Sequence, residues 1–405
     1  MIRPFSALRP TPQLAAEVVA PPYDVVSFDE ARALAQGKPW SFLHISRPEI
    51  DLPPGTDPYS GPVYAKAREN LDRMRERGIL ERDPAPHFYA YRMVMDGHVQ
   101  TGLVGAASIA AYDQGRIRRH ELTRPGKEDD RVRQIEALNA QTGPVLLAYP
   151  DCSEVDELLN DAAKAPPEID VTASGGVRHM LWTIADETAI RRFAAAFEAM
   201  AALYIGDGHH RSAAASRVAA SRGTSARDGF LCVAFPQREM RILPYNRLVR
   251  DLKGMDRSEF LRRVSASFRV ALSAKPVSPE RQGVFGLYLP GQWYRLEIDQ
   301  AAISTIAGGN PVASLDVSLL ADKLLDPILG IIDPRTDPRI DFVGGIRGLE
   351  ELERRVESGM AAALSMHPTS MHELMEVADA GHIMPPKSTW FEPKLADGLV
   401  SLVLD

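Results

Sequence analysis

The stretch Gly206–Arg211 holds the residues of this chain that are best suited to chemistry. It contains two glycines, one carboxylate, two imidazoles and one guanidinium, on Gly206, Gly208, Asp207, His209, His210 and Arg211. Glycine allows a positive φ and a close approach between backbone and ligand. Backbone N–H groups at the start of a helix are unpaired and attract anions. The stretch therefore predicts a phosphate cradle that also contains an acid or a base.

Other polar stretches are candidates for the same site. Residues 118–131 include ten charged or histidine residues among fourteen, and a Pro-Gly break makes part of the run a loop. Proline also stiffens or flanks the segments around Tyr23 and Lys387. The candidates in these stretches, with one from a polar break at 244–247, are Tyr23, Asp24, Arg119, His120, Glu121, Lys127, Asn246, Lys387, Ser388 and Thr389. We expect them to face the cradle in one cleft.

The spacing of the polar residues bears on the cofactor. Asp207, His209 and His210 are too close in sequence to form one metal site from protein ligands alone. Mg²⁺ needs only one or two carboxylates when substrate phosphates supply the other ligands. The sequence therefore favours Mg²⁺ with a nucleotide, with Asp207 as the metal ligand, over hydrolysis at Zn²⁺. The chain contains no Gly-x-Ser-x-Gly elbow, no Rossmann fingerprint and no Walker A glycines, although a Ser-His-Asp triad stays open.

Composition narrows the class of protein. The 405 residues carry 47 Lys and Arg against 54 Asp and Glu, a net charge of −7, which argues against a general nucleic-acid partner. The two cysteines argue against a disulfide framework and a cysteine zinc site. No signal peptide and no apolar stretch of membrane-spanning length is visible. These features predict a cytoplasmic protein without a membrane partner.

Several local patterns predict the elements that position the candidates. An apolar run ending near Ile205 predicts a strand, and an alanine-rich run predicts a helix from near Arg211 to Arg222. The patterns also predict a strand at 41–46, a helix at 28–36 that begins with a capping box of Ser27 and Glu30, and helices at 127–141 and 314–325. Two hairpins are predicted, at 87–109 around Asp96-Gly97 and at 284–298. This alternation predicts an α+β (mixed α/β) fold. We divide the chain into segments 1–115, 116–255 and 256–405.

The same residues carry a family resemblance. Residues 206–211 resemble the Asp-Gly-His-His-Arg signature of free-serine kinases in the ParB/sulfiredoxin superfamily. Nearly the whole chain resembles the DUF1015 family of unknown function, in the motifs at 21–24, 119–123, 207–211, 244–247 and 385–389. The resemblance implies a ParB/sulfiredoxin-like core at 116–255 that binds ADP or ATP. Sulfiredoxin chemistry is contradicted, because His209 stands where sulfiredoxin has its cysteine nucleophile.

One departure from the kinase pattern concerns the general base. The free-serine kinases have a catalytic glutamate near the N-terminus, after a Lys-Pro-His pattern. The corresponding place here, Arg9-Pro10-Thr11-Pro12, has no glutamate. Either another carboxylate, Glu121 or Asp24, takes its place, or the reaction differs.

The resemblance implies a nucleotide-dependent phosphotransferase that acts on free serine or phosphoserine. In this reading Asp207 orients or deprotonates a hydroxyl, His209, His210 and Arg211 hold phosphate, and Arg119, Lys127 and Lys387 neutralise charge. The catalytic group is Asp207, His209, His210 and Glu121. The nucleotide-binding group is Gly206, Gly208, Arg211, Arg119, His120, Lys127, Lys387, Ser388 and Thr389, and the substrate group is Tyr23, Asp24 and Asn246. A ParB-like regulator that binds or hydrolyses a nucleotide is the alternative, and a purely structural interaction protein is the third. The nucleotide, the direction of transfer and the oligomeric state stay open.

Overall fold

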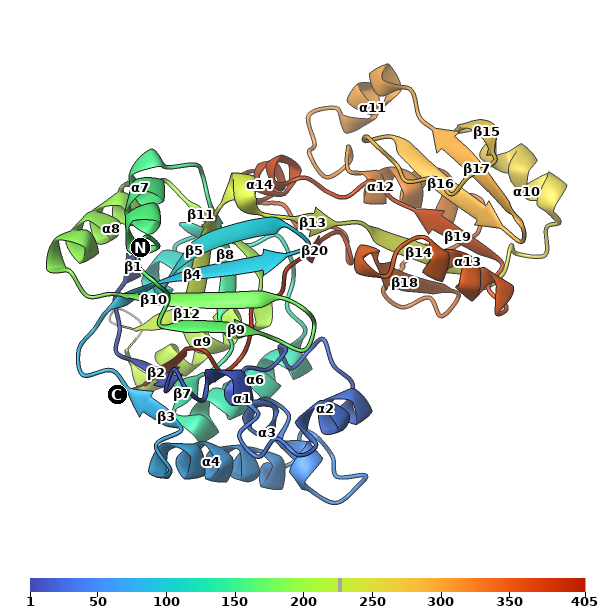
Figure 1. Ribbon diagram of the computed structural model, residues 1–405. Coiled ribbons are helices and arrows are strands. Elements are labelled where there is room, and N and C mark those ends of the chain that lie inside the picture. Colours follow the sequence, from blue (N-terminus) through green and yellow to red (C-terminus); the bar gives the residue numbers. More distant parts are fainter. Residues whose placement is uncertain (225–227, 405) are drawn as a thin grey trace. The chain divides into compact units, whose positions relative to one another are not determined.

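The computed structural model describes residues 1–224 and 228–404, which form two compact units (Figure 1). Unit 1 comprises Met1–Met240 together with the described part of Pro393–Asp405, and unit 2 comprises Arg241–Glu392. Each unit has its own large sheet and its own helices. The mixed α/β class predicted from the sequence is confirmed.

A nine-stranded mixed sheet is the centre of unit 1. Its order is β6 (Ile117–Arg118), β11 (Leu203–Asp207), β8 (Val145–Tyr149), β12 (Gly229–Pro236), β5 (His98–Ser108), β4 (Phe88–Met95), β10 (Arg178–Ile184) and β9 (Ile169–Thr172), with β1 (Ile2–Arg3) beside β5. The pairs β6–β11 and β8–β12 are parallel and the other pairs are antiparallel. The β4–β5 hairpin turns at Asp96–Gly97, as predicted.

Helices supply the apolar side chains that bury this sheet. Every residue of β8 and β12 is buried, which explains their continuous apolar sequences. Phe193 and Phe197 of α8 and Ala214 and Val218 of α9 belong to the same hydrophobic core as the sheet. The helices that contribute to this core are α5 (Ile109–Asp113), α6 (Pro125–Leu138), α7 (Ser153–Ala162), α8 (Glu187–Ala199) and α9 (His209–Arg222), and the short turn η2 (Gln237–Glu239) follows β12.

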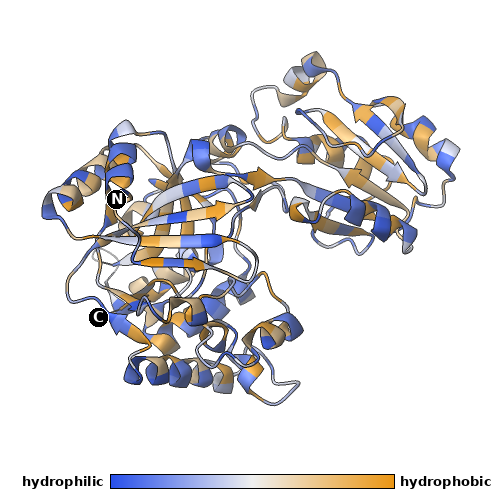
Figure 2. Cartoon of the chain, in the orientation of Figure 1, coloured by the Kyte–Doolittle hydropathy of each residue, from blue (hydrophilic) through white to orange (hydrophobic). Residues whose placement is uncertain are grey.

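A second, four-stranded sheet in unit 1 joins distant parts of the chain. Its order is β3 (Leu80–Arg82), β2 (Ala7–Pro10), β21 (Ser401–Val403) and β7 (Ala140–Gln141). The accompanying helices are α1 (Ala15–Val18), α2 (Phe28–Ala35), α3 (Leu43–Ser46), η1 (Pro48–Asp51) and α4 (Gly61–Glu76). Figure 2 shows hydrophilic and hydrophobic residues alternating along α4, whose buried stripe contains Val63, Ala67, Leu71 and Met74. The strand β21 lies between β2 and β7, so the segment after unit 2 completes unit 1.

Unit 2 is built on a six-stranded antiparallel sheet. Its order is β15 (Arg269–Ser273), β17 (Gln292–Glu297), β16 (Val284–Leu289), β19 (Ala362–Ser365), β14 (Tyr245–Val249) and β18 (Ile340–Gly344), and β13 (Ile242–Leu243) pairs with β20 (Trp390–Phe391). The remaining elements are α10 (Arg257–Val264), α11 (Gln300–Ala307), α12 (Asp316–Leu320), η3 (Ala321–Leu325), η4 (Gly345–Arg347), α13 (Glu350–Glu357) and α14 (Met371–Asp379). The predicted β16–β17 hairpin is present.

Three local predictions need correction. The segment 41–46 contains helix α3 rather than a strand, and Phe42, Leu43 and Ile45 are all buried, so the run is too short and too apolar to show a period. Helix α6 covers Pro125–Leu138 rather than 127–141, because Asn139 adopts a left-handed conformation with φ 49° and ends it. The helix predicted at 314–325 is α12 followed by the π-helical turn η3.

The three sequence segments cut across the two units. Segment 1–115 is not separate, since β4 and β5 lie in the same sheet as β8, β11 and β12. Segment 116–255 continues into β13 and β14 of unit 2, and segment 256–405 returns to unit 1 at Pro393.

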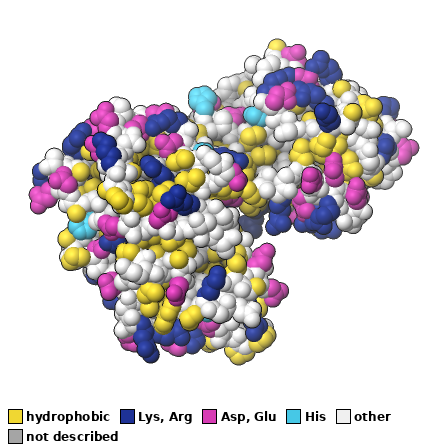
Figure 3. Space-filling model, viewed as in Figure 1, with side chains coloured by type: hydrophobic (Ala, Val, Ile, Leu, Met, Phe, Trp, Pro, Cys, Tyr) yellow, Lys and Arg dark blue, Asp and Glu magenta, His cyan; other side chains and the backbone are white. Residues whose placement is uncertain are grey.

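Within the described residues, no helix has the length and apolar composition needed to cross a bilayer. Cationic and anionic side chains are interspersed on the face in Figure 3.

Candidate functional site

The centre of the candidate site is a sharp turn from strand β11 to helix α9. The strand runs to Asp207 and the helix begins at His209, so a single residue, Gly208, connects them. Gly208 has φ 98°, a value that L side chains rarely adopt, and a Cβ there would lie 3.0 Å from Nε of Arg211. The predicted strand–loop–helix order is present, but the loop is shorter than predicted because glycine reverses the chain in one residue. His209, His210 and Arg211 form the first helical turn, whose N–H groups lack intrahelical acceptors.

Asp207 lies between two cations. Its Oδ2 atom is 3.4 Å from Nζ of Lys394 and 3.6 Å from a guanidinium nitrogen of Arg211. Burial raises the pKa of Asp207, but the positive charges of Lys394 and Arg211 outweigh burial and hold this pKa well below its ordinary value. About a third of the Asp207 side chain remains exposed (34%). The site therefore presents an ionised, partly accessible carboxylate at neutral pH.

The two adjacent histidines face different surroundings. The Nε2 atom of His210 accepts a 2.9 Å hydrogen bond from the Arg124 backbone, so its Nδ1 atom carries the proton in the neutral ring. The ring of His209 is buried, its Nε2 atom lies 3.4 Å from the backbone nitrogen of His120, and its Nδ1 atom is 3.9 Å from Oε2 of Glu121. Burial lowers the pKa of His209 and of His210. Both rings are therefore neutral at pH 7.

His120 packs edge-on against His209. The two ring centroids are 4.5 Å apart with an interplanar angle of 87°. The His120 side chain is 2% exposed, and neither ring nitrogen has a hydrogen-bond partner of ordinary geometry among the described residues. Burial lowers the pKa of His120 to about 4, although the nearby Ile205 carbonyl and Asp207 oppose this shift. Glu121, the next residue, has an exposed side chain.

A narrow pocket adjoins the helix start. It has a volume of about 30 Å³, room for about two water molecules, and its polar lining includes Tyr23, Arg131, Thr142, Arg211 and Asp397. The guanidinium of Arg131 lies 3.9 Å from the centroid of the Tyr23 ring. Asp397 is 2% exposed and its Oδ1 atom has no hydrogen bond among the described residues. Burial raises the pKa of Asp397 to about 7, although Arg211 opposes the rise.

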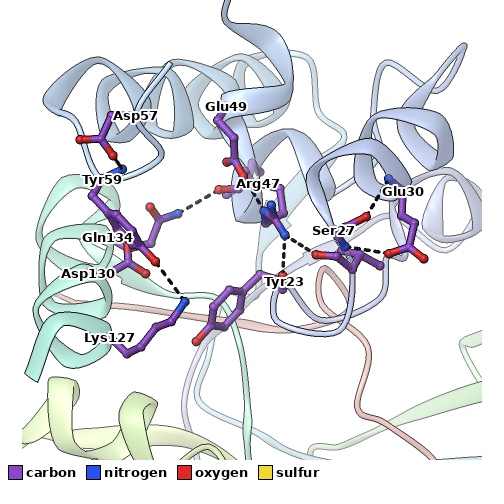
Figure 4. Close-up of polar contacts among 12 residues, drawn as sticks. Tyr23, Ser27, Glu30, Arg47, Glu49, Asp57, Tyr59, Lys127, Asp130 and Gln134 are labelled. Atoms are coloured by element: carbon purple, nitrogen blue, oxygen red, sulfur yellow. Dashed lines mark hydrogen bonds and ion pairs between the residues drawn. The ribbon is translucent and has the colours of Figure 1, made fainter. Parts of the chain in front are cut away.

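Contacts outside the pocket hold its aromatic wall in place. Arg47 donates hydrogen bonds to the backbone carbonyls of Tyr23 and Val26 and to a carboxylate oxygen of Glu49 (Figure 4). Burial raises the pKa of the Tyr23 phenol to about 12. The Tyr23 phenol is therefore neutral at pH 7, and the Tyr23 backbone is held in place by Arg47.

The model of a family described as a protein of unknown function, DUF1015, matches residues 2–318. The chain belongs to the DUF1015 family. Among curated proteins, none matches the chain.

Several solved structures are distantly similar to this DUF1015 chain. A free serine kinase in complex with AMP has 12% identity and a TM-score of 0.35, over 71% of this chain and 89% of that chain. SbnI with a C-terminal truncation, from Staphylococcus aureus, has 11% identity and a TM-score of 0.39, over 74% and 87%. A conserved hypothetical protein from Pyrococcus furiosus has 14% identity and a TM-score of 0.33, over 71% and 92%.

Most of the predicted residues belong to unit 1. Tyr23 lies in the pocket and His120 lies beside His209, whereas Asp24 is exposed and contributes charge to Arg211 and His210. Lys127 donates a 3.0 Å hydrogen bond to the Tyr59 hydroxyl (Figure 4). Arg119 is exposed and its guanidinium lies 5.3 Å from the centroid of the Tyr112 ring. Gly206 is a buried residue of β11.

Four predicted residues belong to unit 2, where their described contacts are local. Asn246 accepts a hydrogen bond from the Met366 backbone, and Ser388 donates one to the Pro385 carbonyl. The Lys387 ammonium is 5.2 Å from the centroid of the Tyr245 ring, and Thr389 is half-buried. That these residues join the unit 1 site stays a prediction.

Sequence reasoning missed three residues of the site: Arg131, Lys394 and Asp397. Arg131 stood at the end of the charged run 118–131, which made it one charge among many. Lys394 and Asp397 follow unit 2, far in sequence from Asp207. The available signal was the polar, proline-containing tail at 385–394, from which the prediction selected Lys387 rather than Lys394.

Proposed function

We propose that this DUF1015 protein is a nucleotide-dependent phosphotransferase that acts on free serine or phosphoserine, with a ParB/sulfiredoxin-like arrangement around Gly208. The observation that carries the proposal is the position of Arg211. It belongs to the first turn of α9 and also lines the pocket that contains Asp397. One guanidinium therefore adjoins both an anion-binding helix start and a small charged pocket.

The start of α9 is suited to nucleotide phosphates. Free N–H groups of the first helical turn point toward a bound anion, and the helix dipole adds positive potential. The Nδ1–H group of His210 is a further donor, because its Nε2 atom is engaged by the Arg124 backbone. Arg211 supplies a permanent positive charge. These groups position the phosphates of ADP or ATP and neutralise their charge.

The pocket is suited to one charged end of a zwitterion. Arg131 and Arg211 can receive a carboxylate or a phosphate, and the unpaired Oδ1 of Asp397 can receive an ammonium group. In the kinase direction the serine hydroxyl oxygen attacks the terminal phosphorus, the bond from that phosphorus to its bridging oxygen breaks, and the hydroxyl proton passes to a carboxylate. Asp207 orients the hydroxyl. Asp397, with a pKa of about 7, is a third candidate base beside Glu121 and Asp24.

The surroundings of Asp207 limit its part in Mg²⁺ binding. Lys394 and Arg211 already face its carboxylate, and their charges repel a divalent cation. Mg²⁺ can be held largely by the phosphates of the nucleotide, with few protein ligands. The fit is therefore to a Mg²⁺–nucleotide complex, which would neutralise phosphate charge during transfer.

The test is a phosphate-transfer assay on the full chain. Purified protein is incubated with Mg²⁺ and serine plus ADP or ATP, and separately with phosphoserine plus AMP or ADP, and products are followed by phosphorus NMR. Formation or consumption of phosphoserine is expected, with loss in Asp207→Asn. If a nucleotide binds but no phosphate moves in either direction, the regulator alternative replaces this proposal. If no nucleotide binds, the structural alternative replaces both.

A further inference from the structure

His120, Glu121 and His209 form a cluster whose arrangement the phosphate cradle does not require. Each residue offers one ligand atom, and the three atoms lie within 4.8 Å of one another. His120 and His209 come from segments that are 89 residues apart, and both rings are buried. The fold therefore brings two imidazoles and one carboxylate to the same point.

The polar atoms of His120 are the second, independent observation. A buried polar group without a partner costs free energy, on the order of 1–3 kcal/mol, so such groups are rare unless a ligand satisfies them. Both ring nitrogens of His120 lack a hydrogen bond of ordinary geometry within the described residues. The ring is held edge-on to His209, and the nearby Ile205 carbonyl is not in ordinary hydrogen-bond geometry with it.

We propose that His120, Glu121 and His209 bind a divalent first-row transition cation of the Zn²⁺ or Co²⁺ type. Imidazole nitrogens favour such cations, whereas Mg²⁺ favours oxygen ligands. Two histidines and one glutamate also form a known kind of zinc site that leaves a coordination position open. The inference goes beyond the proposed function, which uses Mg²⁺ carried by a nucleotide.

The measured distances fit this ligand set after small movements. Nδ1 of His209 and Oε2 of Glu121 are 3.9 Å apart, close to the separation of two ligands that each lie about 2.1 Å from one ion. The Glu121 side chain is exposed (54%). Metal at Nδ1 places the proton on Nε2 of His209, which gives up the contact with the His120 backbone. At 3.4 Å, that contact is longer than an ordinary hydrogen bond.

Charge around the cluster both opposes and favours a cation. The start of α9 carries partial positive charge, and Arg119 adds a positive charge near His209, so both oppose a bound cation. Asp207 places a negative charge near both imidazoles and Glu121 adds a second one, so both carboxylates favour a bound cation. Neutral imidazoles keep their lone pairs for a metal ion, so binding does not have to displace a proton from either ring.

The test is a titration of the metal-free full chain with Co²⁺ and, separately, with Zn²⁺, without nucleotide or serine. We expect one equivalent to bind with micromolar or tighter affinity, with visible Co²⁺ absorption bands typical of nitrogen ligands. Millimolar Mg²⁺ should not displace the ion. No binding, or binding that Mg²⁺ abolishes, would overturn the proposal.

Matched variants separate this site from surface binding. Glu121→Gln keeps the size of an exposed side chain and should weaken Co²⁺ binding roughly tenfold or more, since even indirect changes around a metal cost 10- to 100-fold. His120→Gln and His209→Gln should remove the absorption bands. His372→Gln, which removes an exposed histidine beside Glu376 in unit 2, should change nothing. Equal affinity in wild type and Glu121→Gln would overturn the assignment even if the histidine variants fail to fold. The readout needs no turnover, so it stands or falls separately from the phosphotransferase proposal.

Discussion

Both units bury polar side chains, but they use them differently. In unit 2, Arg247 donates to the carbonyls of Tyr245 and Lys387, and Ser365 donates to the carbonyl of Val277. In unit 1, the ring nitrogens of His120 and the Oδ1 atom of Asp397 are buried without such partners in the described residues, and Asp397 lines a pocket. Unit 2 also buries an atom without a partner, Oδ2 of Asp316, but the other oxygen of that carboxylate accepts a hydrogen bond from the Gly283 backbone. Backbone-bonded side chains fix loops, whereas buried groups left without partners are where water, an ion or another ligand can bind.

This difference gives a physical criterion for the functional part of the chain. In the sequence, a polar residue at a proline-rich or glycine-rich position can either fix a loop or bind a ligand. The sequence therefore did not distinguish Ser388 from Arg211. Both side chains donate to a backbone carbonyl, Ser388 to that of Pro385 and Arg211 to that of Pro144, but Arg211 also lines the pocket.

The Asp207→Asn variant is expected to cause the largest loss of activity. It preserves shape but removes the negative charge between Lys394 and Arg211, so turnover of phosphoserine should fall roughly 100-fold or more. Nucleotide binding should persist, because the helix start and Arg211 remain. Asp186→Asn is the matched control: Asp186 caps α8, and asparagine caps a helix equally well. Comparable losses in both variants would contradict a special role for Asp207.

Arg211→Ala should weaken ADP binding roughly 10- to 100-fold, since a charge-assisted contact to phosphate is worth about 1.5–3 kcal/mol. Isothermal titration of the full chain measures this loss. Arg217→Ala on the same helix removes an exposed guanidinium that pairs with Glu128 and Asp129, and should leave ADP affinity unchanged. Equal affinity in wild type and Arg211→Ala would show that α9 does not hold phosphate.

Asp316 in unit 2 supplies a pH-dependent test of the contrast. Burial raises its pKa to about 7, while one oxygen accepts a 2.8 Å hydrogen bond from the Gly283 backbone. The Asp316 carboxyl therefore keeps its proton to a higher pH in the folded state than in the unfolded state. This proton stabilises the folded state fully below about pH 4, and the stabilisation is lost as the pH rises to about 7. Asp316→Asn should be more stable than wild type by about 4 kcal/mol near pH 8, and this gain should vanish near pH 4.

Chemical denaturation of the full chain at several pH values measures the Asp316 effect. ADP affinity should be the same in variant and wild type, because Asp316 is bonded within its own unit. A stability difference that stays constant across pH would contradict the assignment of the raised pKa to Asp316.

A pair of glycine variants separates strain from site geometry. Gly208 and Gly223 flank α9 at φ 98° and 70°, so alanine at either position should cost about 1–2 kcal/mol of stability. A Cβ at Gly208 also meets Arg211 at 3.0 Å, whereas a Cβ at Gly223 meets no described atom within 4 Å. Only Gly208→Ala should therefore weaken ADP binding. Weakening by both would indicate a general loss of the helix.

Ser365→Ala should give the smallest effect. It removes a buried 2.6 Å hydrogen bond to the Val277 carbonyl, and should lower the free energy of unfolding by about 1 kcal/mol. Turnover and ADP affinity should not change. A loss of ADP affinity in this variant would break the distinction between the two units.

Local signals in the sequence predicted local structure well. The capping box of Ser27 and Glu30, the turn at Asp96–Gly97 and the glycine between β11 and α9 are all present. Each depends on a few adjacent residues. The strand predicted at 41–46 was wrong, because burial on all sides of α3 removes the periodicity that separates a helix from a strand.

The site could be predicted only in part, because long-range topology decides the rest. The charged run 118–131 and the Asp207 loop were found from composition, and the fold does bring His120 beside His209. Nothing adjacent to Lys394 or Asp397 indicates that the chain leaves unit 1 at Met240 and returns at Pro393. When two partner residues are separated in sequence by a whole unit, their neighbours in the sequence do not reveal that they meet.

This excursion has a consequence for the order of events during protein synthesis. A nascent chain that ends within unit 2 already contains Asp207, His209 and Arg211, but it lacks Lys394, Asp397 and the strand β21 that joins β2 to β7. Until the ribosome has made the return segment, Asp207 has no lysine beside it and the pocket lacks its buried carboxylate. Under the proposed function, unfinished chains are therefore expected to be inactive until the return segment has been synthesised.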